Sequence, residues 1–251
     1  MDVVYRVRPA NEFTIAELKE PYLWFSRPVG FKGDRNDANI CAFINDTGAI
    51  RLGIEHSLPE FPYESFYKQM GHTGICCFTS ELPDNERIKG FRKCSKRNCV
   101  CVEYDKHKLE EFFKNHKSTP IHPCFIPVVY DDNPTELDTY DKWSFQWSED
   151  QDGKQYKTIP GILQGHPRDR DVFIQKLFSR ISYRFKDQKE IRIILGGCNI
   201  PSHDENLLGY RIPIPEYAIN RVILYPNVQK DYEEQLNEIA SIKGKINHIT
   251  V

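Results

Sequence analysis

Short apolar or alternating runs recur along the chain, each bounded by proline, glycine or charged residues. Runs of about four to eight residues that are rich in β-branched and aromatic side chains are typical of β-strands. The sequence therefore predicts strands at residues 3–8, 22–26, 74–79, 99–104, 125–130, 190–196 and 221–225.

Helical spacing of apolar residues is found in a few longer segments. A short helix is predicted at residues 13–19, and Asp105 is predicted to cap a helix that runs through Lys114. Two further helices are predicted at residues 172–185 and 229–242, where apolar side chains recur on one stripe.

The order of these elements predicts the fold class. Strands are mixed with isolated helices and do not alternate regularly with them, which favours an α+β fold over a doubly wound parallel sheet. No repeat or low-complexity linker divides the chain, so we expect one α+β domain over residues 1–251. Its sheet should be mixed and mostly antiparallel, with several helices and a charged insertion. An acidic excursion at residues 131–168 is predicted to be the most mobile segment.

Composition narrows the class of protein. The 251 residues include 34 Lys+Arg and 36 Asp+Glu, and the net charge of −2 excludes nucleic-acid binding through overall charge, though not through a local patch. No apolar run reaches the length of a membrane helix, and the N-terminus lacks a secretory pattern, so a cytoplasmic protein with no membrane partner is expected. P-loop, dinucleotide-fingerprint and nucleophile-elbow motifs are missing, which disfavours Rossmann-type enzymes that use ATP or NAD.

Charge is nevertheless segregated along the chain. Residues 87–108 hold eight basic and two acidic side chains, whereas residues 131–152 hold eight acidic and one basic. The basic segment also contains Phe91 and Tyr104, and such interleaving suits RNA, DNA or another phosphate-bearing ligand. A solvated loop, or a surface for an acidic protein, is an equally good interpretation. The candidate contact residues are Arg92, Lys93, Lys96 and Arg97.

Eight cysteines in a chain without a secretory pattern are expected to be reduced. Cys94, Cys99 and Cys101 lie close together, but structural zinc usually requires two pairs with C-x(2–4)-C spacing. The spacing favours buried thiols, with Cys99 and Cys101 on one strand face, over a zinc site. No metal is therefore predicted.

Glu190 and Arg192 project from one face of a predicted strand whose isoleucines face the core. A carboxylate accepts hydrogen bonds from hydroxyl groups and a guanidinium binds anions in a forked geometry, so this pair suits a polar ligand. The alternative is an amphipathic strand whose charges are solvated or paired across strands.

The N-terminal strands form another candidate. They offer Arg6, Ser26 and aromatic rings that include Tyr5, Phe25 and, in the following loop, Phe31. These groups would suit the lining of a nucleotide pocket. The alternative is a strand pair followed by an ordinary Gly/Asp turn.

Six short motifs occur in a characteristic order. They are Tyr5-Arg6, Leu23-Trp24-Phe25-Ser26-Arg27-Pro28, Gly74-Ile75-Cys76-Cys77-Phe78-Thr79, Cys101-Val102-Glu103-Tyr104-Asp105, Lys189-Glu190-Ile191-Arg192-Ile193-Ile194 and Arg221-Val222-Ile223-Leu224-Tyr225. This order resembles a widespread bacterial domain-of-unknown-function family that is often found near phage-defence and abortive-infection genes. The resemblance runs from about Tyr5 to the C-terminus and implies a toxin-like defence effector.

The layout also faintly resembles ADP-ribosyltransferases, which implies NAD as a cofactor. In that resemblance Arg6 would hold an NAD phosphate and Ser26 would order the strand beside the nicotinamide ribose. Glu190 would hydrogen-bond the ribose 2′-hydroxyl and stabilise the oxocarbenium-like charge. Tyr5 or Phe25 would stack on the nicotinamide ring.

Two functional hypotheses follow. The first is a defence effector that acts on a nucleotide, as an ADP-ribosyltransferase-like enzyme with a nucleic-acid or protein acceptor. The second is a non-catalytic sensor or binding module that docks RNA or an acidic protein through residues 87–108. Convergence of Arg6, Ser26 and Glu190 on one cleft would distinguish the first from the second.

Overall fold

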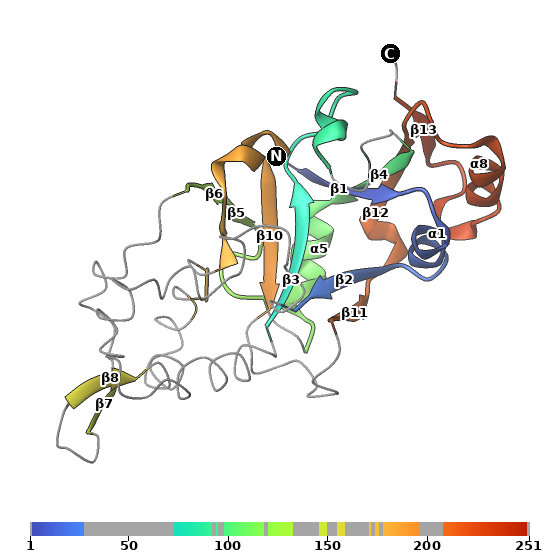
Figure 1. Cartoon of the computed structure of the whole chain (residues 1–251). Helices are drawn as coiled ribbons and strands as arrows, with labels where there is room; N and C mark the ends of the chain where they lie inside the picture. Colours follow the sequence, from blue (N-terminus) through green and yellow to red (C-terminus); the bar gives the residue numbers. More distant parts are fainter. Residues whose placement is uncertain are drawn as a thin grey trace.

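In the computed structural model, β3 (Gly74–Thr79) lies inside a nine-stranded sheet and carries partners on both of its sides (Figure 1). One side pairs antiparallel with β10 (Glu190–Leu195) along the whole strand. The other side is shared between β1 (Val3–Pro9) and β2 (Tyr22–Ser26). The sheet therefore divides at β3 into two wings.

The register of β3 defines this division. Tyr5 of β1 lies opposite Thr79, at the end of β3. Ser26 of β2 lies opposite Ile75, near its beginning. The first two strands, β1 and β2, are connected along the chain by the helix that follows β1. In the sheet they do not pair with each other, and both pair with β3.

Each wing continues away from β3. The first wing runs from β1 to β4 (Cys99–Asp105), β12 (Ile219–Leu224) and β13 (Ile246–His248). The second consists of β2 and β11 (Gly209–Pro213), and β5 (Ile126–Pro127) pairs with β10 on its outer side. Only β12 and β13 are parallel among the described pairs of this sheet, which confirms a mixed, mostly antiparallel α+β fold.

Two small pairs and several helices complete the described elements. The pairs are the parallel β6 (Val129–Tyr130) with β9 (Arg180–Ile181) and the antiparallel β7 (Gln146–Glu149) with β8 (Gln155–Thr158). The α-helices are α1 (Glu12–Lys19), α5 (Lys106–Lys114) and α8 (Lys230–Asn237). The 3-10 helices are η2 (Arg87–Gly90), η3 (Tyr183–Gln188), η4 (Glu216–Ala218) and η5 (Ala240–Ile242).

The structure describes residues 2–27, 73–91, 94, 98–117, 120–132, 146–149, 155–158, 171, 174–175, 178–195 and 208–249. Most of the acidic excursion, and with it the predicted mobility of residues 131–168, lies outside these ranges. No helix within them is long and apolar enough to cross a membrane.

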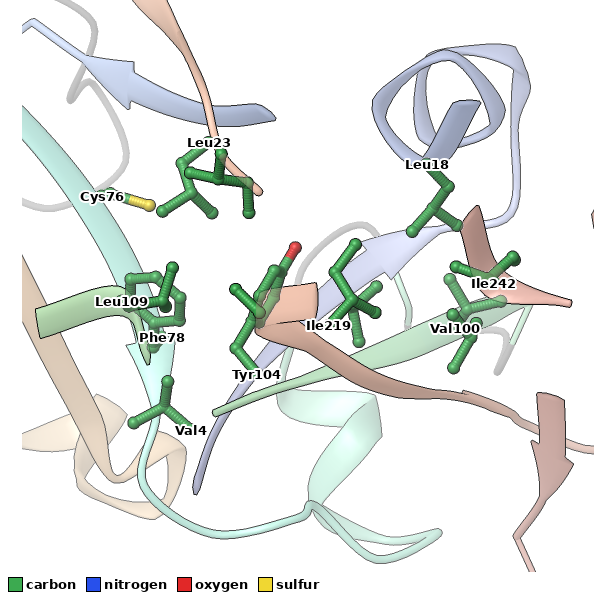
Figure 2. Packing of buried hydrophobic residues seen from close by; sticks show 14 of the residues in the cluster. Val4, Leu18, Leu23, Cys76, Phe78, Val100, Tyr104, Leu109, Ile219 and Ile242 are labelled. Carbon is green, nitrogen blue, oxygen red and sulfur yellow. The ribbon is translucent and has the colours of Figure 1, made fainter. Parts of the chain in front are cut away.

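The main core lies on one face of the sheet, where the wings and the helices meet (Figure 2). Strand residues such as Phe78 and Tyr104 pack there with Leu18 of α1 and Leu109 of α5. Phe78 and Tyr104 meet edge to face with ring centroids 5.8 Å apart. Every second residue of these strands enters the core because side chains alternate between the faces of a strand.

A smaller cluster covers part of the opposite face. Its buried members come from β1, β4, β12, the residue after β12 and the connection between β3 and β4. They are Tyr5, Ile88, Cys94, Cys99, Cys101, Ile223 and Tyr225. The sheet is therefore covered on both faces at this end.

The predicted helix at 172–185 is wrong in its second half. The chain bends at Ser179, and Arg180 and Ile181 pair with Val129 and Tyr130 as strand β9. A 3-10 helix, η3, then follows. Pairing with a segment 51 residues away in sequence thus overrides the local helical spacing, as tertiary contacts commonly do.

Candidate functional site

Arg6 lies on the core face of β1, away from the other predicted catalytic residues. It is 6% exposed, and its Nη1 is 3.0 Å from Oε1 of Glu17 on α1. Residues that face each other in an antiparallel pair share a sheet face, so the Tyr5–Thr79–Glu190 row places Glu190 on the face opposite Arg6. The expected convergence of Arg6 and Glu190 does not occur.

Ser26 shares a face with Glu190 but does not meet it. Ser26 is opposite Ile75, whereas Glu190 is opposite Thr79. Four residues of β3 span about 13 Å along the strand, and β2 and β10 lie on opposite sides of β3. The two side chains are thus too far apart to hold one reacting group.

Glu190 and Arg192 bind each other at the edge of this face. The Nε of Arg192 donates to Oε1 of Glu190 at 2.6 Å, and Nη1 donates to the carbonyl oxygen of Phe178 at 2.7 Å. Arg192 is fully buried, so its charge is balanced inside the protein. The two charges are thus paired with each other within one strand, and not across strands as the alternative to a ligand site expected.

The predicted aromatic contacts are also enclosed. Phe25 is fully buried and packs edge to face on Phe113 at 5.8 Å. Tyr5 is 9% exposed and lies opposite Glu103 of β4. Phe31 lies outside the described residues. Of the rings proposed to stack on NAD, the two that the structure describes, Tyr5 and Phe25, are therefore enclosed in the protein.

Five polar side chains from five strands occupy one row across the sheet: Arg221, Glu103, Tyr5, Thr79 and Glu190. Nε and Nη2 of Arg221 each lie 2.7 Å from Oε2 of Glu103. Burial and the Glu103 carboxylate raise the pKa of Tyr5, so its phenol stays a hydrogen-bond donor at neutral pH. Because Arg221 and Glu103 are 118 residues apart in sequence, no local pattern predicts this network.

The basic segment contributes less than its sequence indicates. Tyr104 is 1% exposed and belongs to the core, so it cannot stack on a ligand. Arg92, Lys93, Lys96 and Arg97 lie outside the described residues.

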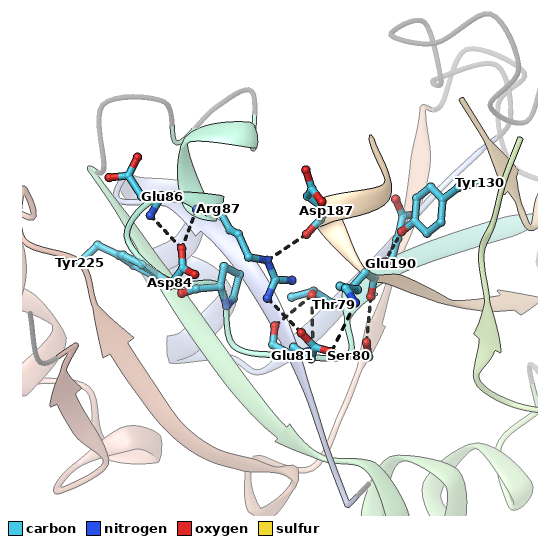
Figure 3. Close-up of polar contacts among 12 residues, drawn as sticks. Thr79, Ser80, Glu81, Asp84, Glu86, Arg87, Tyr130, Asp187, Glu190 and Tyr225 are labelled. Carbon is cyan, nitrogen blue, oxygen red and sulfur yellow. Dashed lines mark hydrogen bonds and ion pairs between the residues drawn. The ribbon is translucent and has the colours of Figure 1, made fainter. Parts of the chain in front are cut away.

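Arg87 on η2 connects this segment to η3 (Figure 3). Its Nε donates to the carbonyl oxygen of Asp187 at 3.0 Å, and its Nη1 donates to Oε2 of Glu81 at 3.1 Å. Gln188 donates to the carbonyl oxygen of Gly90 at 3.4 Å. Two segments that are far apart in sequence are thus held together beyond the end of β3.

The exposed side of η3 combines aromatic and basic groups. Tyr183 is 51% exposed, with Lys186 Nζ 4.5 Å from its ring centroid. The Arg184 guanidinium lies 4.6 Å from the centroid of Phe185. We call these four residues the aromatic–basic surface. The sequence signal for it is the alternation Tyr-Arg-Phe-Lys, which lies at the end of the predicted helix and was not recognised as a binding feature.

Lys186 remains charged at neutral pH. Its Nζ donates to the Tyr183 hydroxyl at 3.0 Å, and this hydrogen bond raises the pKa of the lysine above its ordinary value. The same contact holds the ammonium group beside the ring. A cation and an aromatic ring are therefore presented together.

Among the described cysteines, Cys76, Cys94, Cys99 and Cys101 are buried, whereas Cys77 and Cys124 are half-buried. Cys94, Cys99 and Cys101 are free and share the smaller cluster. Among the described residues, no group of three or more Cys, His, Asp or Glu side chains is arranged to hold a metal ion.

Comparisons of the chain with known protein families, with curated proteins and with solved structures gave no match.

Proposed function

We propose that the chain is a non-catalytic module that binds single-stranded RNA through the aromatic–basic surface. The observation that carries the proposal is the half-exposed ring of Tyr183, with the Lys186 ammonium beside it. In the defence setting that the family resemblance implies, such a module would act as a sensor.

The cations of η3 favour a polyanion. Residues 182–189 hold three basic side chains and one acidic side chain. Arg184, Lys186 and Lys189 are all exposed on or next to η3. Lysine and arginine neutralise phosphates and release the counterions around them, which supplies most of the affinity for nucleic acid.

Aromatic exposure favours single-stranded RNA over an acidic protein. An acidic protein requires only cations, whereas an exposed ring offers a stacking face to an unpaired base. In a duplex the bases are stacked on each other and are not available to Tyr183. Two rings and two cations within four consecutive residues match the pairing of stacking and phosphate contacts that single strands need.

Binding of a fluorescent oligouridine of about 12 nucleotides, followed by anisotropy, tests the stacking contact. Tyr183→Leu should weaken binding by about 5- to 150-fold, since stacking on one base is worth about 1–3 kcal/mol. Tyr183→Phe keeps the ring and should bind nearly as well as the wild type. Tyr217→Leu is the matched control, because Tyr217 is 60% exposed on η4.

Salt dependence tests the phosphate contacts. The double variant Arg184→Ala/Lys186→Ala should reduce the slope of log K against log salt by about 1.4, as expected for two contacts to a single strand. Lys230→Ala/Lys243→Ala removes two exposed charges elsewhere and should leave the slope unchanged. The proposal would be overturned if both double variants reduced the salt slope equally, or if the wild type bound no RNA. It would also be overturned if polyglutamate displaced the fluorescent RNA as effectively as unlabelled RNA does.

A further inference from the structure

The second wing presents two aromatic rings on the side that faces away from the main core. Leu23 and Phe25 of β2 are fully buried in that core. Tyr22 and Trp24 alternate with them and therefore lie on the opposite face, where both are half-buried. β11, the last described strand on this side of the sheet (Figure 1), places Arg211 opposite Trp24. We call this side of β2 and β11 the Trp24 face, and we infer that it binds a purine mononucleotide.

The indole of Trp24 lies over Gly209 of β11. A Cβ at Gly209 would come within 2.6 Å of two carbon atoms of the indole, so the ring can occupy this position only beside a glycine. The β11 backbone thus supports one side of the ring. Among the described residues, no other aromatic ring stacks on Trp24 and no acceptor is bonded to its indole N–H, which is not enclosed. A planar ligand can therefore stack on the ring and accept a hydrogen bond from it.

Arg211 supplies a cation beside the indole. Its guanidinium lies 5.0 Å from the ring centroid of Tyr22, and the residue is exposed. Within the described ranges, no carboxylate forms an ion pair with Arg211. Stacking on Tyr22 holds the guanidinium in place and leaves its N–H groups for a phosphate, which accepts two parallel hydrogen bonds from such a group. Charge complementarity therefore favours an anionic ligand over a neutral sugar.

The ring of Trp24 and the cation of Arg211 are close enough to serve one nucleotide. The two residues face each other in the antiparallel pair, where opposite side chains start about 5 Å apart. The indole leans toward Gly209 and the guanidinium toward Tyr22, so they do not stack on each other. A base on the indole can thus bring its phosphate to the guanidinium. The two fused rings of a purine bury more apolar surface on the indole than a pyrimidine does.

The charge on the Trp24 face fits one phosphate better than a strand. Arg211 is the one cation among the described residues of β2 and β11 on this face, and the other side chains there are Tyr22, Trp24, Ser26 and Pro213. A single strand takes most of its affinity from several phosphate contacts. A mononucleotide on the Trp24 face neither requires nor excludes RNA at the aromatic–basic surface.

Isothermal titration calorimetry of the full chain with AMP tests the site. The wild type should bind AMP with a Kd below about 1 mM. Adenosine lacks the phosphate and ribose 5-phosphate lacks the base, so each should bind about tenfold more weakly or worse. Maltohexaose, a neutral oligosaccharide, should bind less tightly than AMP.

Two pairs of variants separate the base contact from the phosphate contact. Trp24→Leu should weaken AMP binding by about fivefold or more, whereas Trp24→Phe keeps a ring and should bind more tightly than Trp24→Leu. Phe13→Leu is the matched control, because Phe13 is 60% exposed on α1. Arg211→Met should weaken AMP binding by about tenfold and leave adenosine binding unchanged. Lys243→Met removes an exposed cation elsewhere and should change neither.

The AMP and RNA sites are distinguished by exchanging their variants. Trp24→Leu should bind the fluorescent oligouridine like the wild type, and Tyr183→Leu should bind AMP like the wild type. The inference would be overturned if the wild type bound no AMP, if Trp24→Leu bound AMP as tightly as the wild type, or if maltohexaose bound more tightly than AMP. Equal losses of AMP and adenosine binding in Arg211→Met would also overturn it, and this comparison decides if Trp24→Leu does not fold.

Discussion

Arg87 donates a hydrogen bond to the carbonyl oxygen of Asp187, which is 100 residues later in the sequence. The same guanidinium donates to Glu81, in the turn that follows β3. One side chain therefore connects the β3–β4 connection to the segment before β10. Arg87 therefore also holds the aromatic–basic surface in place, because Asp187 and the four residues of that surface all belong to η3.

Arg87→Ala should lower the free energy of unfolding by about 1–2 kcal/mol, since it removes two hydrogen bonds, one of which is to a carboxylate. The side chain is 22% exposed, which keeps the effect below that of a buried ion pair. Hydrogen exchange of the amides in residues 183–188 should become faster, and RNA binding should weaken. Urea denaturation, hydrogen exchange and anisotropy measure the three effects.

Lys89→Ala is the control for this variant. Lys89 pairs only with Glu86 among the contacts described for it, and both side chains are exposed, so its loss should cost less than about 1 kcal/mol. If the amide hydrogen-exchange rates of residues 183–188 were unchanged in the Arg87→Ala protein, other contacts would hold η3 in place.

Arg192→Met should destabilise the fold by about 3–5 kcal/mol in urea denaturation, because it leaves Glu190 with a charge and no cation in a largely buried position. The double variant Glu190→Gln/Arg192→Met removes that charge as well and should recover part of the loss. Arg211→Met is the control. Arg211 is exposed and lies over the Tyr22 ring, so its replacement should cost no more than about 1 kcal/mol. A double variant no more stable than Arg192→Met would contradict the assigned pairing.

Asp84 should make the stability of the η2 turn depend on pH. It accepts hydrogen bonds from the backbone N–H groups of Arg87 at 2.8 Å and Glu86 at 2.9 Å, and these lower the pKa of Asp84 below its ordinary value of 3.8. A carboxyl group with a lowered folded pKa stabilises the fold above its unfolded pKa, and this contribution is lost as pH falls through the folded pKa.

The thermal unfolding midpoint measured against pH tests this expectation. The difference between the wild type and Asp84→Asn should be constant at neutral pH and should shrink below about pH 4. Asp231→Asn, at an exposed position on α8, controls for the change of net charge. A difference that persists undiminished in strong acid would mean that the Asp84 charge is not its source.

Gly209 should tolerate no side chain. A Cβ at this position would lie 2.5 Å from the carbonyl oxygen of Phe25 and 2.6 Å from the Trp24 ring. Gly209→Ala should therefore destabilise the protein by about 1–3 kcal/mol in urea denaturation. Gly90→Ala is the matched control, since no atom lies within 4 Å of its added Cβ. Equal stability of the two variants would contradict the close packing of β11 on β2.

The sequence predicted elements well where the local signal agrees with the tertiary contacts. The bounds of β2 and β3 match the predicted strands, and Asp105 caps α5 by accepting from the N–H of Lys108, as expected. Strand β11 was not predicted, because its run 209–213 contains glycine, arginine and proline and pairs with β2 far away in sequence.

The candidate site was less predictable than the fold. Whether Arg6 shares a face with Glu190 depends on the register of β1 against β3, and a shift of one residue would reverse it. Register between distant strands is set by packing across the whole sheet, which short motifs do not encode. For the same reason, neither segment taken alone predicts that Arg87 of η2 is hydrogen-bonded to Asp187 of η3.

Because β1 and β2 both pair with the same side of β3, neither strand can be paired early in synthesis of the protein. β1 and β2 are separated by only 12 residues but do not pair with each other, and their described partners all lie at residue 74 or later. As the chain leaves the ribosome, both strands therefore present open edges until β3 and the strands after it have emerged. Exposed strand edges invite aggregation. We therefore expect β1 and β2 to need protection from aggregation until β3 has been synthesised.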